Sequence, residues 1–151
     1  MEVFKIVAEQ YASRLSASGR PNRWNRKGEF VIYTGSSRSL SSLELIVHRS
    51  SIKPDITYRV MIFYLPDDPY FYTTFNSQDL VKNWQSLHAY TNLQELGSQW
   101  YQNKQSLILK VPSAVIPLEY NYLLNTRHPE FEKYINLVRT EAYFWDERLP
   151  L

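Results

Sequence analysis

The sequence predicts an α+β fold, a single domain in which mixed or antiparallel sheets are flanked by helices. Three observations predict it. The 151 residues suffice for one domain that buries about 68–70% of its unfolded surface, and they are too few for two ordinary domains. Short segments rich in β-branched and aromatic residues recur along the chain. Amphipathic helical segments lie between them, and no repeat, low-complexity tract or linker divides residues 1–151.

The predicted strands follow in chain order. Residues 3–7 alternate well enough for an opening strand, and residues 9–15 then have the pattern of a short helix. Residues 29–34 lie between Gly28 and Gly35 and predict a buried strand. Segments of similar composition predict the remaining strands, at residues 56–65, 106–111, 120–125, 134–138 and 142–145.

Three further helices are predicted from their start signals. One directly follows the strand at residues 29–34, because Ser36 or Ser37 can accept hydrogen bonds from the first free backbone N–H groups. The other two, at residues 77–90 and 91–101, each begin at a Ser or a Thr. These elements complete the predicted α+β pattern.

Glu44 is the unusual residue of the first of these helices. Leu40, Leu43 and Val47 form an apolar stripe, which Ile46 widens, and Glu44 lies on the edge of that stripe. An unpaired buried charge is costly, so a buried Glu44 requires a cation, strong hydrogen-bond donors or a cleft within reach. Burial statistics alone favour the alternative, a Glu at the helix edge that points to water.

Composition and charge exclude several classes of protein. The chain has no Cys, and therefore no disulfide framework, thiolate nucleophile or Cys-ligated metal, which fits a reducing cytosol. It has no apolar signal segment and no run of about 18 apolar residues, so we expect no membrane span and a cytoplasmic location. The formal net charge of +2 is far from the dense Lys and Arg stripe of a nucleic-acid binder.

Residues 16–28 are predicted to form a loop that is rich in cations. Ser, Gly, Pro and Asn alternate there with Arg20, Arg23, Arg26 and Lys27. Arg20, Arg26 and Lys27 fit a solvated basic loop. Arg23 lies between a Pro-Asn turn and a Trp, and its planar guanidinium could bind a diphosphate through two hydrogen bonds.

Metal and serine-hydrolase chemistry are not indicated. Asp67 and Asp68 stand between two prolines, where Asp is common in turns, and no further ligand follows at metal spacing, so no metal is expected. The three histidines have no partners at metal or catalytic-triad spacing, and we assign them structural roles. Ser113 follows a predicted strand end, but no Gly-x-Ser-x-Gly elbow surrounds it.

Five separated blocks carry a more specific pattern. The first is RWNRKGEFVIYTGSSRSLSSLELIVH at residues 23–48. The others are GSQW at 97–100, LKVPSA at 109–114, NYLLNTRHPEF at 121–131 and FWDERL at 144–149. In this order, and over nearly the whole chain, they resemble the RES domain, the toxin of Xre–RES toxin–antitoxin pairs.

The resemblance implies a fold similar to that of ADP-ribosyltransferases and an enzyme that consumes NAD as its substrate, with no other cofactor. The implied reaction cleaves the nicotinamide–ribose bond by hydrolysis or phosphorolysis and arrests growth by depleting NAD. Transfer of ADP-ribose to a host protein is the alternative. The family's catalytic positions correspond here to Arg23, Tyr33, Glu44 and Ser113.

The implied roles of these four residues follow the chemistry of NAD. Loss of nicotinamide leaves positive charge on the ribose, as in glycoside hydrolysis, and the carboxylate of Glu44 suits that charge. Arg23 would anchor the diphosphate and so position the reacting carbon. Tyr33 would stack on or bond the nicotinamide-ribose end, and Ser113 would orient it by a hydrogen bond.

Three more residues are expected to contact NAD, namely Lys5, Trp24 and Asn25. Lys5 stands near the position where many family members have Arg, and its ammonium group would hold a phosphate with less geometric control. The implied protein partner is an Xre-family antitoxin, with a toxin homodimer as one arrangement within the complex.

Two alternatives of other classes remain open. One is a growth regulator that binds RNA or DNA through the basic loop, which predicts salt-sensitive binding and indifference to NAD. The other is a RES-like fold that binds an antitoxin without catalysis. The presence of all four family positions argues against the second alternative.

Overall fold

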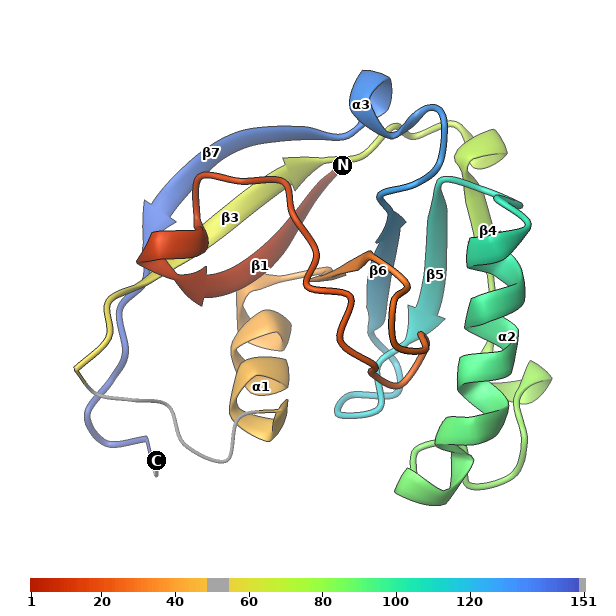
Figure 1. The fold of residues 1–151 in the computed structure, drawn as a ribbon. Coiled ribbons are helices and arrows are strands. Elements are labelled where there is room, and N and C mark those ends of the chain that lie inside the picture. Colours follow the sequence, from red (N-terminus) through yellow and green to blue (C-terminus); the bar gives the residue numbers. More distant parts are fainter. Residues whose placement is uncertain (49–54, 150–151) are drawn as a thin grey trace.

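The computed structural model describes residues 1–48 and 55–149, and in this part of the chain seven strands form one mixed sheet (Figure 1). The strand order is β4-β5-β6-β2-β1-β3-β7. Only β4 and β5 pair in parallel among these strands. With helices beside the sheet, this arrangement confirms the predicted α+β class.

The elements have the following bounds. The strands are β1 (Glu2–Ala8), β2 (Val31–Gly35), β3 (Tyr58–Tyr64), β4 (Tyr72–Thr74), β5 (Ile108–Pro112), β6 (Tyr120–Asn125) and β7 (Asn136–Ala142). The α-helices are α1 (Arg38–His48), α2 (Tyr90–Gln102) and α3 (Phe131–Tyr134). Short 3-10 turns lie at Glu9–Tyr11, Pro69–Phe71, Ser77–Asp79 and Leu87–Ala89. In residues 1–48 and 55–149, no helix has the length and apolar composition needed to cross a membrane.

The sheet opens between β1 and β2. These strands share a single paired position, Phe4 with Gly35. Their outer neighbours pair over much longer stretches, β1 with β3 from Glu2 to Ala8 and β2 with β6 from Val31 to Gly35. The chain that joins β1 to β2 crosses the gap between the two halves of the sheet, as the red to orange segment in Figure 1 shows. We call this segment, residues 12–30, the β1–β2 connection.

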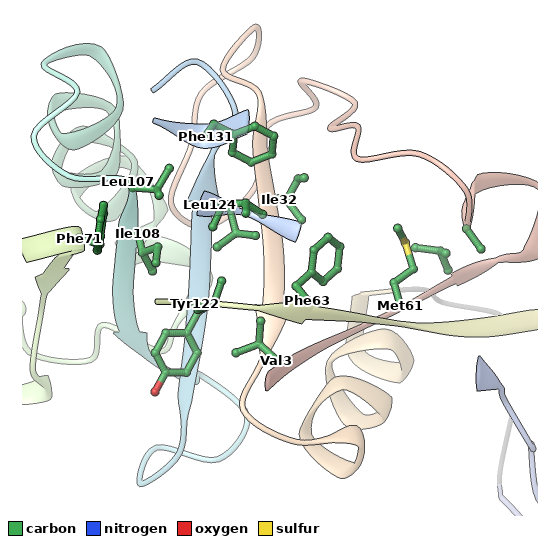
Figure 2. Packing of buried hydrophobic residues seen from close by; sticks show 14 residues of the cluster. Val3, Ile32, Met61, Phe63, Phe71, Leu107, Ile108, Tyr122, Leu124 and Phe131 are labelled. Atoms are coloured by element: carbon green, nitrogen blue, oxygen red, sulfur yellow. The ribbon is translucent and has the colours of Figure 1, made fainter. Parts of the chain in front are cut away.

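The main core lies on one face of the sheet (Figure 2). Val3 of β1 pairs with Phe63 of β3, and Ile32 of β2 pairs with Leu124 of β6. All four side chains belong to this cluster. These side chains are at most 1% exposed. Because side chains alternate along a strand, one face of all the central strands contributes to this cluster.

The opposite face carries two separate apolar clusters, one under each long helix. Phe4, Ile6 and Ile62 pack with Leu45 of α1. A second cluster, formed with Trp100 of α2, contains Val31, Leu109 and Leu123. The two helices therefore cover different halves of the same face, on either side of the opening between β1 and β2 (Figure 1).

Most predicted strands agree with the structure, but one predicted helix is wrong. Residues 77–90 form two isolated 3-10 turns, because Leu80 is extended (φ −99°, ψ 160°) and Asn83 has a left-handed φ of 62°. Of the predicted helix at 9–15, only one 3-10 turn forms, at Glu9–Tyr11. The strand predicted at 134–138 is found as β7, which begins at Asn136, but the strand predicted at 142–145 is wrong, because β7 ends at Ala142 and residues 143–145 are not part of a strand. The short edge strand β4 was not predicted.

The start of α1 is as predicted, but its buried face is not. Ser37 Oγ accepts a hydrogen bond from the backbone N–H of Leu40 at 3.0 Å, so Ser37 is the N-cap. Leu40 is buried, whereas Leu43 and Val47 of the predicted stripe are 39% and 63% exposed. The prediction of that stripe is therefore wrong.

Small residues explain the orientation of α1. A Cβ atom on Gly35 would lie 2.6 Å from Ser41 Oγ, so the helix packs closely on the end of β2. Ser41 Oγ also donates to the carbonyl oxygen of Phe4 at 2.9 Å. The inward face of α1 therefore runs through Leu40, Ser41 and Leu45, and Glu44 lies on this face. The periodicity of apolar residues did not reveal this inward face, because Ser41 is a polar residue although it is buried.

Candidate active site

A cleft of about 430 Å³ lies where β1 and β2 diverge. Lys5 of β1 and Tyr33 of β2 contribute to its lining. Glu44 and His48 come from α1, and Arg20 comes from the β1–β2 connection. The opening of the sheet thus brings side chains from four separate segments, among them Lys5, Arg20 and Glu44, to one cavity within the size range of small-molecule sites.

Glu44 is held at the wall of this cleft by three side chains. Its Oε1 accepts hydrogen bonds from Ser113 Oγ at 2.8 Å and from Asn121 Nδ2 at 2.7 Å. Its Oε2 lies 3.2 Å from His48 Nε2. The Glu44 side chain is only 18% exposed, so the partners that the sequence analysis required for a buried carboxylate are present.

These contacts determine the charge of Glu44. Burial raises the pKa of its carboxyl group, but the hydrogen bonds from His48, Asn121 and Ser113 together outweigh burial, and the pKa lies below its ordinary value of 4.5. Glu44 is therefore ionised at neutral pH. A fixed negative charge in a cleft can stabilise a positive charge that develops on a bound molecule.

Acid should remove part of the stability that Glu44 provides. Because its folded pKa is lowered, ionised Glu44 stabilises the folded state above the unfolded pKa near 4.5, and this contribution disappears as pH falls through the folded pKa. Urea unfolding at a series of pH values checks this. The free energy of unfolding of the wild type should fall relative to that of Glu44→Gln below about pH 4.5. A difference that stays constant down to about pH 3 would contradict the lowered pKa.

Ser113 lies behind Glu44 and not on the cleft surface. It is fully buried directly after β5, and its Oγ accepts hydrogen bonds from the N–H groups of Val115 and Ile116, both at 3.1 Å. These two donors leave the Ser113 hydroxyl to donate to Glu44. Ser113 thus orients the carboxylate, and the hydrogen bond to substrate expected from the family stays a prediction.

Tyr33 contributes to the cleft lining while its hydroxyl is used inside the protein. Tyr33 Oη donates to Asn25 Oδ1 at 2.7 Å and accepts from the N–H of Trp24 at 3.1 Å. Burial raises the pKa of the Tyr33 hydroxyl, so it stays protonated. The hydroxyl therefore ties the β1–β2 connection to β2, and the stacking role expected for Tyr33 stays a prediction.

Tyr33→Phe should destabilise the protein. Without the hydroxyl, Asn25 Oδ1 and the N–H of Trp24 lose their partner in a buried environment, which costs about 1–3 kcal/mol. Urea unfolding of the variant measures this loss. Tyr11→Phe, at an exposed tyrosine, is the matched control and should unfold like the wild type. Equal stability of the two variants would show that the Tyr33 hydroxyl does not hold the connection.

Trp24 and Asn25 support the connection from the protein interior. Asn25 Nδ2 donates to the carbonyl oxygens of Arg20, Arg26 and Glu29 at 2.9, 3.1 and 3.2 Å. Trp24 is 3% exposed and stacks on Phe75. Neither residue lines the cleft, so their expected contacts with NAD stay predictions, and their observed role is to fix the backbone of the loop.

Arg23 also lies away from the cleft lining. Its Nη1 donates to the carbonyl oxygen of Trp84 at 3.0 Å, and its guanidinium lies 4.7 Å from the centre of the Tyr90 ring. Lys5, by contrast, lines the cleft. Of the predicted site residues, the structure gathers Lys5, Tyr33 and Glu44 at the cleft with Ser113 behind Glu44, and it does not bring Arg23, Trp24 and Asn25 there.

Sequence reasoning missed two partners of Glu44. His48 was assigned a structural role, although its position four residues after Glu44 places both side chains on one helix face. Asn121 gave no local signal, because its contact with Glu44 depends on the pairing of Asn121 with Gly35 in the β2–β6 ladder. Within the described residues, no group of three or more His, Asp or Glu side chains could hold a metal ion.

Comparison with known sequences places the chain in a family. The family model of the RES domain matches residues 3–146. A Yersinia enterocolitica protein named Toxin Res is 33% identical over 153 residues, with 99% of each chain covered. A Sphingobium protein named Prs ADP-ribosylating toxin is 30% identical over 142 residues, which cover 91% of this chain and 88% of that protein.

A solved structure has a similar fold. It is the crystal structure of the M. tuberculosis MbcT–MbcA toxin–antitoxin complex. The TM-score is 0.69 at 16% sequence identity, and the match covers 94% of this chain and 83% of that one. At this identity the likeness concerns the fold alone. Since the RES model spans nearly the whole chain and full-length relatives share about a third of its residues, the chain belongs to the RES domain family.

Proposed function

We propose that this protein cleaves the nicotinamide–ribose bond of NAD in the cleft between β1 and β2, with Glu44 as the catalytic carboxylate. The observation that carries the proposal is the ionised, largely buried Glu44, which three side chains hold at the cleft wall. An oriented carboxylate of this kind suits a reaction in which positive charge develops on the substrate. Membership in the RES family supports NAD as that substrate.

The proposed reaction begins with departure of nicotinamide. The electron pair of the bond between ribose C1′ and the ring nitrogen moves to nicotinamide, which leaves as a neutral molecule, and positive charge remains on the ribose. Glu44 stabilises this charge without changing its own protonation. Attack of water on C1′ gives ADP-ribose and a proton, whereas attack of phosphate gives the phosphate ester of ADP-ribose. NAD is a substrate here, and no further cofactor is required.

Transfer of ADP-ribose to a protein is the second candidate function. The relative named Prs ADP-ribosylating toxin is 30% identical to this chain and favours it. The first step would be the same in the same cleft, and a side chain of the target protein would replace water as the acceptor. Only the identity of the product distinguishes the two functions.

We further propose an antitoxin as protein partner, of the Xre family, with a toxin homodimer as one arrangement of the complex. The fold likeness to the toxin in a toxin–antitoxin complex supports a partner of this kind. The cytoplasm is the proposed location, because NAD is abundant there and the chain has no Cys.

Release of nicotinamide from NAD by the purified protein tests the proposal. We expect release with the wild type and with Glu119→Gln, a control at an exposed carboxylate in the loop after β5. Mass spectrometry of the product then identifies water, phosphate or protein as the acceptor. If no nicotinamide is released with phosphate present and antitoxin absent, and no label reaches proteins of a cell lysate, the enzyme proposal is wrong. A chain that only binds an antitoxin, or binds nucleic acid in a salt-sensitive way, would then be the better account.

A further inference from the structure

We propose that Arg20, with Lys5 beside the same cleft, binds the diphosphate of the dinucleotide, and that Arg23 is a structural residue of the β1–β2 connection. This inference rests on the proposed function and identifies the cation that selects a diphosphate-containing substrate. It departs from the expectation drawn from the sequence, in which Arg23 anchors the diphosphate and Arg20 is a solvated surface residue.

Arg23 already has partners within the protein. The carbonyl oxygen of Trp84 accepts a hydrogen bond from its Nη1 at 3.0 Å, and the Tyr90 ring lies 4.7 Å from its guanidinium carbon. Trp84 precedes α2 and Tyr90 is its first residue, and neither lines the cleft. A diphosphate bound by Arg23 would have to replace these contacts. They instead attach the connection to the α2 side of the molecule.

The guanidinium of Arg20 is available to a ligand. Arg20 lines the cleft, and within residues 1–48 and 55–149 its side chain makes no hydrogen bond or ion pair. Some other arginines are paired with carboxylates, for example Arg38 with Glu141 at 2.7 Å and Arg139 with Glu2 at 2.6 Å. A planar guanidinium without an acidic partner can form two parallel hydrogen bonds to phosphate oxygens.

The backbone around Arg20 is held in place before any ligand binds. Asn25 Nδ2 donates to the Arg20 carbonyl oxygen at 2.9 Å, and the Arg20 N–H donates to Ser18 Oγ at 3.2 Å. The preceding residue, Gly19, has a left-handed φ of 70°, and its carbonyl oxygen accepts from the N–H of Gly28 at 2.8 Å. A fixed backbone lowers the entropy cost of presenting a long side chain to a ligand.

The cleft carries charges of both signs. Glu44 is the one carboxylate among the described residues that line it, and it projects from α1. Lys5 and Arg20 add positive charge from β1 and from the connection. A ribose that becomes positive fits beside Glu44, and a diphosphate fits beside the two cations. The cleft therefore offers a partner for each of these two parts of NAD.

Binding of ADP-ribose to a Glu44→Gln background tests the inference by calorimetry, without dependence on turnover. We expect the additional change Arg20→Ala to weaken ADP-ribose binding roughly 10- to 100-fold, as for the loss of charged hydrogen bonds. Arg26→Ala is the matched control, because Arg26 is an exposed cation of the same loop that does not line the cleft. It should bind ADP-ribose like the background protein. Arg23→Ala should lower the melting temperature and weaken binding less than Arg20→Ala does.

Two results would overturn the inference. One is a loss of affinity in Arg20→Ala that is no greater than in Arg26→Ala. The other is an Arg23→Ala protein that melts like its parent and binds ADP-ribose more weakly than Arg20→Ala does. Failure of the proposed function is a separate result, seen as absent nicotinamide release by the wild type. If the wild type releases nicotinamide while Arg20→Ala keeps full affinity, the proposed function stands and this inference is wrong.

Discussion

Replacement of Glu44 by Gln is expected to slow nicotinamide release by ~10²–10³-fold, the usual effect of losing one key electrostatic group. Gln keeps the size of the side chain and an oxygen that can accept from Ser113 and Asn121. It removes the negative charge that the developing cation on the ribose requires. Steady-state release of nicotinamide at saturating NAD measures this effect, because it reports the chemical step separately from substrate affinity.

The Glu44→Gln experiment needs evidence of an intact fold. Circular dichroism and urea unfolding near neutral pH should show a folded protein, and the exposed control Glu119→Gln should release nicotinamide like the wild type. A folded Glu44→Gln protein that keeps the wild-type rate would show that the carboxylate is not the catalytic group. The hydrogen bonds from Ser113, Asn121 and His48 would then be purely structural.

Gly97→Ala is expected to destabilise the protein by about 3 kcal/mol or more, at the upper end of overpacking effects. In an exposed helix the same change would stabilise by about 1 kcal/mol, because Ala is the better helix former. At Gly97 of α2, however, a Cβ atom would lie 1.8 Å from the carbonyl oxygen of Trp24 and 2.8 Å from its carbonyl carbon. These are backbone atoms, so the β1–β2 connection would have to move away from α2.

Urea unfolding followed by tryptophan fluorescence measures this change, since Trp24 and Trp100 are both buried. Gln99→Ala, at an exposed position of the same helix, is the control and should change the free energy of unfolding by less than about 0.5 kcal/mol. Nicotinamide release should fall in Gly97→Ala as well, because a displaced Trp24 cannot donate to Tyr33 Oη. A variant as stable as the wild type would mean that the connection does not depend on its close approach to α2.

The parts of this protein that local sequence determines could be predicted. The N-cap Ser37, the position of Ser113 after a strand end and the bounds of β6 follow from residues that are neighbours in sequence. Family resemblance added Tyr33 and Glu44, which do lie at the cleft. The buried face of α1 could not be predicted, because it depends on the close contact between Gly35 and Ser41.

Local sequence also could not show which of the cations in residues 16–28 lines the cleft. Composition shows four positive side chains in that stretch but not which one faces the cleft. The backbone path decides this, and it is fixed by Asn25 from within and by the left-handed Gly19 and Gly28. The role of Asn121 could not be predicted for a similar reason, because strand pairing brings it to the carboxylate of Glu44, 77 positions earlier in the chain.

Because β1 and β2 share a single paired position, the sheet can leave room for the cleft there without losing the integrity of the fold. Each half of the sheet has its own ladder and its own apolar cluster beneath a helix. The main core nevertheless joins the halves, because Val3 and Phe63 pack in one cluster with Ile32 and Leu124, so the sheet opens locally at the cleft while the fold stays in one piece.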